Sequence, residues 1–379
     1  MITLENVTKV FPGTKIPAVD NLSLQVKKGQ ICVLVGPSGC GKTTTMKMIN
    51  RLIEPTEGKI TVNDDDISRV NPINLRRGIG YVIQEIGLFP HLTIEDNIAT
   101  VPKELKWPRE RIIERVHELM VLVGLDPELH GKRRPSALSG GQRQRVGVAR
   151  AMAADPPVLL MDEPFGAVDP ITRGRLQNEF LRLQEQIKKT IIFVTHDIDE
   201  AIKMGNRIAA MRDGKMVQYA APEELLATPK DEFVARLVGR NRSIKRLHLI
   251  RAQAALQKGV ASVGMGDTLE RIKDYVADSP MNVVMVLDDQ KRLQGVISQQ
   301  DVQKDALKGV NAGDVLASDL CQELPNYASS DATLNDVLSV MLNFGEGYVA
   351  VIDEKERFQG IITLGDILEV VKADANSAA

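Results

Sequence analysis

Short apolar runs recur along the first part of the chain, at 30–35, 157–162 and 190–194, and they are rich in Val, Leu and Ile. Runs of this length are typical of strands buried on both faces of a parallel sheet, because neither face then needs polar side chains. Mixed apolar and polar segments at 44–49 and 143–152 have the character of helices that pack against such a sheet. The pattern therefore predicts an α/β fold for this part of the chain.

A different pattern begins after residue 240. The segment 294–302 recurs as 359–367, and the segment 284–288 recurs as 349–353, both at an offset of 65 residues. The same spacing over two separate blocks indicates an internal duplication. We expect each copy to fold as helix, strand, turn, strand and helix.

The composition is that of a folded globular protein, with 43% hydrophobic and 26% charged residues. A chain of 379 residues has room for two or three domains. The formal net charge of −2 gives no overall attraction to nucleic acid or to a membrane surface. The three cysteines, Cys32, Cys40 and Cys321, lack the spacing of a metal motif and fit a protein of the reducing cytosol.

The sequence carries no recognisable membrane or export segment. Its first residues lack the basic-then-apolar pattern of a secretory signal. No uninterrupted apolar stretch approaches the roughly 20 residues that a membrane-spanning helix needs. We therefore expect that another chain spans the bilayer if this protein works at a membrane.

Residues 36–43 read G-x-x-x-x-G-K-T between an apolar run and a helical segment, which is the setting that a phosphate-binding loop requires. Glycines let backbone N–H groups turn inward around an anion, and the following helix N-terminus adds its positive dipole end. Lys42 supplies a cation for the outer phosphates, and the Thr43 hydroxyl can bind Mg²⁺. The residues expected to bind a nucleoside triphosphate here are Gly36, Pro37, Ser38, Gly39, Cys40, Gly41, Lys42, Thr43 and Thr44.

Two acidic residues, Asp162 and Glu163, end the apolar run at 157–162. Asp162 suits Mg²⁺, because hard cations prefer oxygen ligands. Glu163 would orient and deprotonate the attacking water. A carboxylate pair at a strand end can instead cap a loop, but beside a phosphate loop we favour the catalytic role.

Residues 138–142 read L-S-G-G-Q directly before a helical segment. Ser139 is a good N-cap, and the two glycines leave the helix start open to an anion. Placed between a phosphate loop and an acidic pair, this motif resembles the signature of the ATP-binding cassette (ABC) ATPases. The resemblance covers residues 1–240 and implies that Ser139, Gly140, Gly141 and Gln142 contact ATP.

The resemblance also implies a P-loop NTPase fold with a RecA-like core and a helical subdomain at about 86–150. Phe11 resembles the aromatic residue that stacks on adenine, although the family more often has Tyr there, and core packing is the alternative. Gln84 resembles the glutamine that touches Mg²⁺ and reports to the partner. His196 resembles the switch histidine that contacts the γ-phosphate. The loop 166–169 resembles the one that crosses the dimer interface, with Val where Leu is common.

In this family two copies pair head to tail and sandwich two ATP molecules. The resemblance implies that Lys42 and Thr43 of one copy face Ser139, Gly140 and Gly141 of the other. Neither half-site is then complete alone. ATP holds the closed homodimer together, and hydrolysis with Glu163 as the base returns it to the open state.

The ABC ATPases of DNA repair and translation often carry two cassettes, long coiled coils or zinc motifs, and this chain has none of them. It also lacks a strong basic patch for nucleic acid. The segment 85–94 is unusually apolar for a loop, and in transporters this region cups a short helix of the membrane subunit. A buried loop inside the helical subdomain is the alternative. We therefore interpret the chain as the ATPase of an importer; a free-standing regulatory ATPase remains the competing hypothesis.

The duplicated segment resembles a tandem pair of CBS domains, at 250–311 and 313–374. In that family the pair has clefts for adenine nucleotides, and the Ser or Thr and the Asp of the repeated block often touch the ligand. The residues that match are Ser298, Asp301, Thr363 and Asp366, with Tyr348 as a residue that could stack on a base. Helix capping by the first four and core packing by Tyr348 are the alternatives.

A cassette followed by tandem CBS domains resembles the ATPase subunits of compatible-solute importers, which carry glycine betaine, carnitine, choline or proline betaine. The resemblance implies a permease, a substrate-binding protein and a place at the cytoplasmic face of the cell membrane. Another small solute stays open as cargo, because motor residues never touch it. The CBS pair would sense ionic strength or a cyclic dinucleotide such as c-di-AMP. The absence of a lysine cluster near the C-terminus favours the dinucleotide.

Overall fold

The computed structural model describes residues 1–83, 87–166, 168–239, 241–279, 281–303, 311–323, 327–345 and 347–377. The chain divides into two compact units, Met1–Arg240 and Asn241–Ala379. Each unit has hydrophobic clusters of its own. Among the described helices, none combines the length and the apolar character that crossing a bilayer requires.

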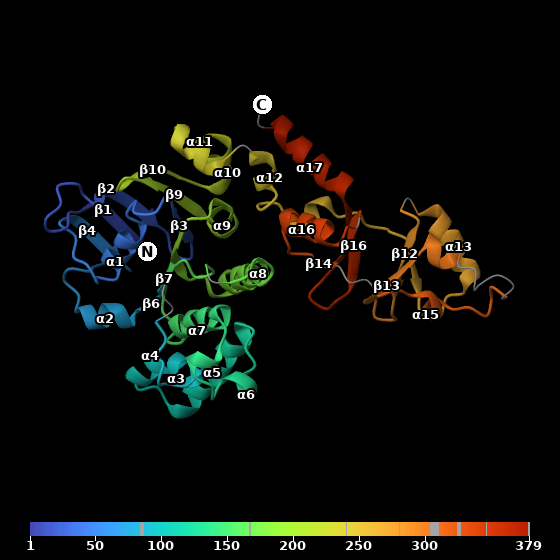
Figure 1. The fold of residues 1–379 in the computed structure, drawn as a ribbon, viewed down its shortest axis with the longest axis horizontal. Coiled ribbons are helices and arrows are strands. Elements are labelled where there is room, and N and C mark those ends of the chain that lie inside the picture. The colour runs from blue at the N-terminus through green and yellow to red at the C-terminus, as the bar shows by residue number, and fades with distance from the viewer. Residues whose placement is uncertain are drawn as a thin grey trace. The chain divides into compact units, whose positions relative to one another are not determined.

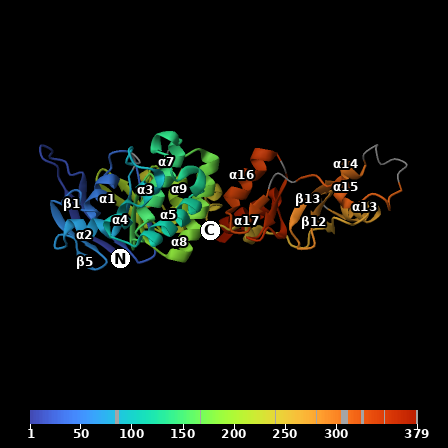
Figure 2. The same ribbon diagram turned by 90° about the horizontal axis from the view of Figure 1, so that it is seen from below.

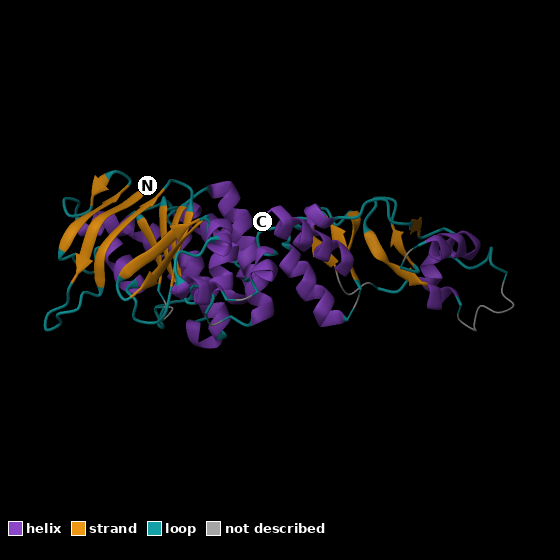
Figure 3. Ribbon diagram, turned by 90° about the horizontal axis from the view of Figure 1, so that it is seen from above, coloured by secondary structure: helices purple, strands orange, loops and turns teal. Residues whose placement is uncertain are grey.

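The centre of the first unit is a six-stranded sheet with the order β10-β9-β3-β8-β7-β6 (Figure 3). Its strands are β3 (Ile31–Val35), β6 (Ile79–Val82), β7 (Val158–Asp162), β8 (Thr190–Thr195), β9 (Arg207–Arg212) and β10 (Lys215–Ala220). All pairings are parallel except that of β9 with β10. Every residue of β3, β7 and β8 is buried, so the apolar runs form central parallel strands as predicted.

A second, antiparallel sheet of the first unit has the order β2-β1-β4-β5. Its strands are β1 (Ile2–Lys9), β2 (Val19–Val26), β4 (Glu57–Val62) and β5 (Asp65–Asp66). Leu22, Leu24 and Val26 of β2 join Cys32 and Leu34 of β3 in one hydrophobic cluster, which ties the two sheets together. The helices on this part of the unit are α1 (Lys42–Ile49), α2 (Pro72–Arg77), α8 (Pro170–Ile187), α9 (Ile198–Met204), α10 (Pro222–Ala227) and α11 (Glu232–Val238).

The remaining helices of the first unit form a separate group below the sheets in Figure 1. They are α3 (Ile94–Ile98), α4 (Thr100–Glu104), α5 (Arg109–Leu122), α6 (Pro127–His130), the 3₁₀ turn Pro135–Ala137 and α7 (Gly140–Met152). Helix α7 contacts α3 and α5 within the group and β6 of the central sheet. It is therefore the element that joins this group to the core.

The second unit contains two three-stranded sheets of the same design. The first half has β11 (Ser262–Gly264), α13 (Leu269–Asp278), β12 (Val283–Leu287), β13 (Leu293–Ser298) and α14 (Gln299–Val302). The second half has β14 (Tyr327–Ser329), α16 (Leu334–Phe344), β15 (Tyr348–Ile352), β16 (Phe358–Thr363) and α17 (Leu364–Ser377). The short segments α12 (Arg242–Arg246), Ala252–Ala255 and α15 (Ala317–Leu320) complete the unit. Figure 2 shows α15 in the same half as α13 and α14. The predicted order is present, with the short strands β11 and β14 in addition.

The two halves exchange the segments that precede them. Ala252 and Ala255 pack in the hydrophobic cluster of the second half, whereas Ala317 and Leu320 pack in that of the first. Isolated backbone bridges repeat the exchange at the 65-residue offset, and they join Arg251 to Thr333, Leu316 to Thr268, Gln257 to Ile361 and Gln322 to Val296. Each folded half therefore takes its first segment from the other sequence repeat.

Candidate active site

The phosphate loop joins the end of β3 to the start of α1. Gly36 has φ 153° and Gly41 has φ 101°, in the region that favours glycine. A Cβ on Gly36 would lie 2.1 Å from the carbonyl oxygen of Met211, and one on Gly41 would lie 2.5 Å from that of Ala18. Neither position can carry a side chain in this conformation, so the shape of the loop requires glycine at both.

The side chain of Lys42 is buried against the loop itself. Its Nζ donates hydrogen bonds to the carbonyl oxygens of Gly36 at 2.7 Å and Pro37 at 2.9 Å. The Cys40 sulfur lies 3.7 Å from the same Nζ, and burial raises the pKa of the Cys40 thiol. A cation held inside the loop is well placed to meet the outer phosphates of a nucleotide.

Two oxygen atoms meet where the loop passes the end of β7. The Thr43 hydroxyl donates to Oδ1 of Asp162 at 3.3 Å. Burial raises the pKa of Asp162, the hydrogen bond from Thr43 opposes this shift, and the neighbouring charge of Glu163 adds to it. A hydroxyl beside a buried carboxylate fits Mg²⁺, because the cation prefers oxygen ligands and would offset the cost of the buried charge.

Glu163 follows β7 with a left-handed backbone, φ 48°, which costs a residue other than glycine about 1 kcal/mol or more. Its N–H donates to the carbonyl oxygen of Val194 in β8 at 3.0 Å. Its Oε1 lies 3.0 Å from Nδ1 of His196. The side chains of Glu163 and His196 are 22% and 68% exposed, so both reach the surface of the site.

Three separate parts of the chain line one cleft. The lining residues are Ser38, Gly39, Gly41, Lys42, Thr43, Thr44, Glu163 and His196. Gly36, Pro37 and Cys40 belong to the same loop without lining the cleft, and Asp162 contacts it through Thr43. Phe11 is not among the described residues that line it. Its ring is partly exposed, and Nζ of Lys9 lies 5.3 Å from the ring centroid. Gln84 falls outside the described residues.

The signature residues 139–142 lie at the start of α7 and are not among the described residues that line this cleft. Ser139 is the N-cap, because its hydroxyl accepts from the Gln142 N–H at 3.2 Å. The Gln142 side chain in turn accepts from the Ser139 N–H at 2.9 Å. Gly140 and Gly141 are partly exposed beside them. Within one chain, therefore, the phosphate loop lines the cleft and the signature does not.

One contact at the site was missed by the sequence reasoning. Nε2 of Gln144, on α7, donates to the carbonyl oxygen of Glu163 at 2.8 Å. Gln144 is only 4% exposed. Gln144 falls in register with the apolar positions of its helix, which indicates that its amide is buried. Because a buried amide needs a hydrogen-bond partner, this pattern is the signal that could have predicted the contact.

A second hollow is lined in part by Gly87 and Phe89 of the apolar segment 85–94, of which residues 85 and 86 lie outside the described part of the chain. Its lining includes Tyr81, Phe89 and three arginines, Arg76, Arg77 and Arg150. Arg150 donates from Nη1 to the carbonyl oxygen of Gly87 at 2.7 Å and lies 6.0 Å from the ring of Phe89. The hollow therefore combines aromatic walls with positive charge.

The CBS candidates of the second unit make local capping contacts. The Ser298 hydroxyl donates to Asp301 at 2.6 Å, and the Thr363 hydroxyl donates to Asp366 at 2.7 Å. The exchanged segment adds Gln257, whose Nε2 donates to Asp366 at 2.6 Å. Tyr348 is half-buried and packs against the cluster between the two sheets. The capping and packing alternatives thus describe the contacts that these five residues make within the chain.

Family models match both units of the chain. A model described as "ABC transporter" matches residues 19–166, and a model described as "CBS domain" matches residues 317–373. Among solved structures, a dimeric ATP-binding cassette in a post-hydrolysis state bound to ADP and Pi is similar with a TM-score of 0.55 and 34% identity. It covers 59% of this chain and 99% of its own.

Three curated relatives are similar over almost the whole chain. The glycine betaine/carnitine/choline transport ATP-binding protein OpuCA of Bacillus subtilis is 45% identical, over 98% of this chain and 96% of its own length. The choline transport ATP-binding protein OpuBA of the same organism is 44% identical, over 98% and 96%. The osmoprotectant import ATP-binding protein OsmV of Salmonella typhimurium is 45% identical, over 96% and 94%.

Proposed function

Because the chain belongs to the ABC transporter ATP-binding proteins, we propose that it is the ATPase subunit of an importer for quaternary ammonium solutes such as glycine betaine, carnitine and choline. The observation that carries the proposal is the match, over nearly the full length, to relatives named for the transport of these solutes. The match spans the cassette and the duplicated second unit alike, so it extends beyond the features common to all cassettes.

Thr43 and Asp162 are the residues that would hold Mg²⁺ at the end of the phosphate loop. The metal would supply charge neutralisation between the phosphates. Lys42 would bind the outer phosphates in place of the loop carbonyls that it now contacts. The Glu163 carboxylate would take the proton of the attacking water, and His196, 3.0 Å away, would bind the γ-phosphate.

A homodimer would complete this site. The cleft holds the phosphate loop, Glu163 and His196, but the signature of the same chain lies elsewhere. A second copy, turned head to tail, would bring its Ser139 and the partly exposed glycines of its α7 to the bound triphosphate. The similarity to a cassette solved as a dimer supports this arrangement.

The second unit offers a further surface for a copy of the chain. Leu342 is 75% exposed on α16, and three more apolar residues nearby in sequence, Phe344, Leu364 and Leu368, are about half exposed. Their equivalents 65 residues earlier in the chain are polar or small: Ala277, Ser279, Gln299 and Gln303. Exposed apolar residues on α16 and α17, with polar or small equivalents in the first half, would suit a contact between two such units.

The hollow beside Phe89 would receive a helix of the permease. Its aromatic walls and the arginines Arg76, Arg77 and Arg150 suit an amphipathic helix with acidic residues at its end. The chain would then work at the cytoplasmic face of the membrane, held there by the permease. A substrate-binding protein would deliver the cargo.

The CBS pair would regulate the cassette by binding an adenine nucleotide or a cyclic dinucleotide. Ser298, Asp301, Thr363 and Asp366 lie at the starts of α14 and α17, where hydroxyl and backbone N–H groups can meet ribose or phosphate. Tyr348, half-buried beside them, would stack on a base.

The cargo proposal is tested by uptake in the native cells. Deleting the gene should abolish high-affinity uptake of radiolabelled glycine betaine that carnitine and choline compete for, and restoring the full chain should recover it. A tagged chain should also bring down a polytopic membrane protein. Unchanged uptake would contradict the cargo, and a chain that purifies without any membrane partner would favour the free-standing regulatory ATPase.

Removing residues 241–379 should leave the cassette folded, because the first unit has a core of its own. We expect ATP affinity within about twofold of that of the full chain, and transport that no longer responds to ionic strength or to c-di-AMP. Nucleotide affinity and the response of transport are measured in parallel. Loss of ATP binding in the truncated chain would contradict the division near residue 240.

A further inference from the structure

The backbone of Glu163 accepts a hydrogen bond from α7, the helix that begins with the signature motif. Gln144 lies three residues after Gly141 on α7, and its Nε2 donates to the Glu163 carbonyl oxygen at 2.8 Å. The N–H of Gly166 reaches the same oxygen at 3.1 Å. Helix α7 therefore carries both the signature and a direct contact to the candidate base.

Glu163 needs such a contact, because its conformation is not one that its own sequence favours. The left-handed φ of 48° is disfavoured for a glutamate, so its neighbours must fix it. The N–H is fixed to Val194 of β8, and Gln144 is the side chain that the structure shows on the carbonyl. Together they set the direction in which the carboxylate leaves the backbone.

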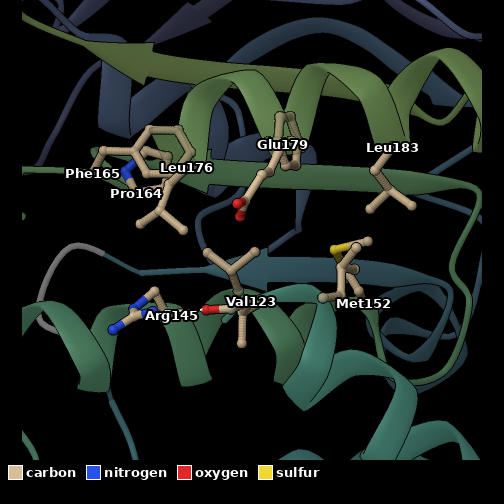
Figure 4. Close-up of a pocket in the computed structure, with 11 residues that line it drawn as sticks. Val123, Arg145, Met152, Pro164, Phe165, Leu176, Glu179 and Leu183 are labelled. Atoms are coloured by element: carbon tan, nitrogen blue, oxygen red, sulfur yellow. Dashed lines mark hydrogen bonds between the residues drawn. The ribbon is translucent and has the colours of Figure 1, made fainter. Parts of the chain in front are cut away.

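Mostly apolar side chains separate α7 from α8 near this hydrogen bond. The two helices face each other across a small cavity lined by Arg145 and Met152 of α7 and by Leu176, Glu179 and Leu183 of α8 (Figure 4). Apolar contacts have no preferred direction, so they do not by themselves orient α7 toward Glu163. The hydrogen bond of a buried amide is directional and costly to break. It therefore fixes the position of α7 relative to Glu163 more closely than apolar contacts do.

We propose, on the basis that Glu163 is the general base, that Gln144 is a positioning residue that couples the signature helix to that base. In the closed dimer, α7 of one copy meets the nucleotide held by the partner. When this contact moves α7, the hydrogen bond from Gln144 moves the backbone of Glu163, the base that acts on the copy's own nucleotide. The two sites are thereby linked within each chain and not only across the interface.

The test replaces Gln144 by Met, which keeps the length of the side chain and removes the donor. In the full-length chain we expect kcat for ATP hydrolysis to fall about 10- to 100-fold, with KM for ATP within about twofold, because the base is displaced while the phosphate loop is untouched. In a Glu163→Gln background, Gln144→Met should still form the ATP-bound dimer. A role in shaping the signature alone would abolish that dimer.

A matched control is Gln184→Met, which removes another buried glutamine; Gln184 lies on α8, and its Nε2 donates to the carbonyl oxygens of Gly29 and Lys189. It should lower thermal stability to a similar extent and leave kcat within about twofold. Gln144→Glu, which replaces the donating nitrogen by oxygen, answers the question if Gln144→Met does not fold, and the same fall in kcat is expected. A kcat near wild type in both Gln144 variants, or a fall that Gln184→Met matches, overturns the proposal. Full turnover in Glu163→Gln alone would instead reject the assignment of the base.

Discussion

Replacing Glu163 by Gln should lower ATP turnover by at least about 100-fold while leaving ATP affinity unchanged. The substitution keeps the shape and the contact to His196 but removes the carboxylate that would accept the proton of water. Nucleotide should still bind, because the phosphate loop, Thr43 and Asp162 are unaltered. The variant should therefore accumulate as an ATP-bound dimer, measured by size-exclusion chromatography with and without ATP.

Glu128→Gln provides the control, since Glu128 is an exposed residue of α6 outside the cleft. It should hydrolyse ATP at the wild-type rate and should not accumulate as a dimer. Turnover near wild type in the Glu163 variant would mean that another group activates the water.

Replacing Gly140 by Asp should lower turnover to a similar extent by a different route. A carboxylate at the start of α7 would face the triphosphate held by the partner, and two negative groups repel each other. The fold should tolerate the change, because a Cβ on Gly140 would meet nothing nearer than the Arg143 guanidinium at 4.0 Å. ATP affinity of the isolated chain should stay the same, since Gly140 does not line the chain's own cleft.

Gly266→Asp is the matched control for the Gly140 substitution. This glycine of the second unit is exposed, and an added Cβ would meet no atom within 4 Å. The variant gains the same charge outside the cassette and should keep full turnover. Equal losses in the two variants would show that added charge, and not its place at the signature, impairs the enzyme.

The residues that line the cleft of the first unit could be predicted because their sequence signals are local. A few neighbouring residues are enough to recognise each part of the site. These parts are the glycines at 36 and 41, the lysine between loop and helix, and the acids at the end of a buried strand. Parallel strands then bring their carboxyl ends to one edge, so the residues meet in one cleft.

Features that depend on distant contacts could not be predicted in this way. The exchange between the halves of the second unit pairs Arg251 with Thr333 and Gln257 with Ile361, and no local pattern encodes such pairings. Gln144 reaches the Glu163 carbonyl oxygen only because α7 lies beside the end of β7 in the folded chain. Phe11 resembles the family's adenine-stacking aromatic, yet it is not among the described residues that line the cleft, because its position depends on how its loop folds.

The most direct test of the central claim, that each active site needs two copies, is to mix two inactive variants. Lys42→Ala has a damaged phosphate loop and a sound signature, and Gly140→Asp has the reverse. A mixed dimer contains one site with both parts intact, so an equimolar mixture should recover ATP turnover well above that of either variant alone, up to about a quarter of wild type, the value for independent sites. A mixture no more active than the two variants measured separately would contradict the shared site.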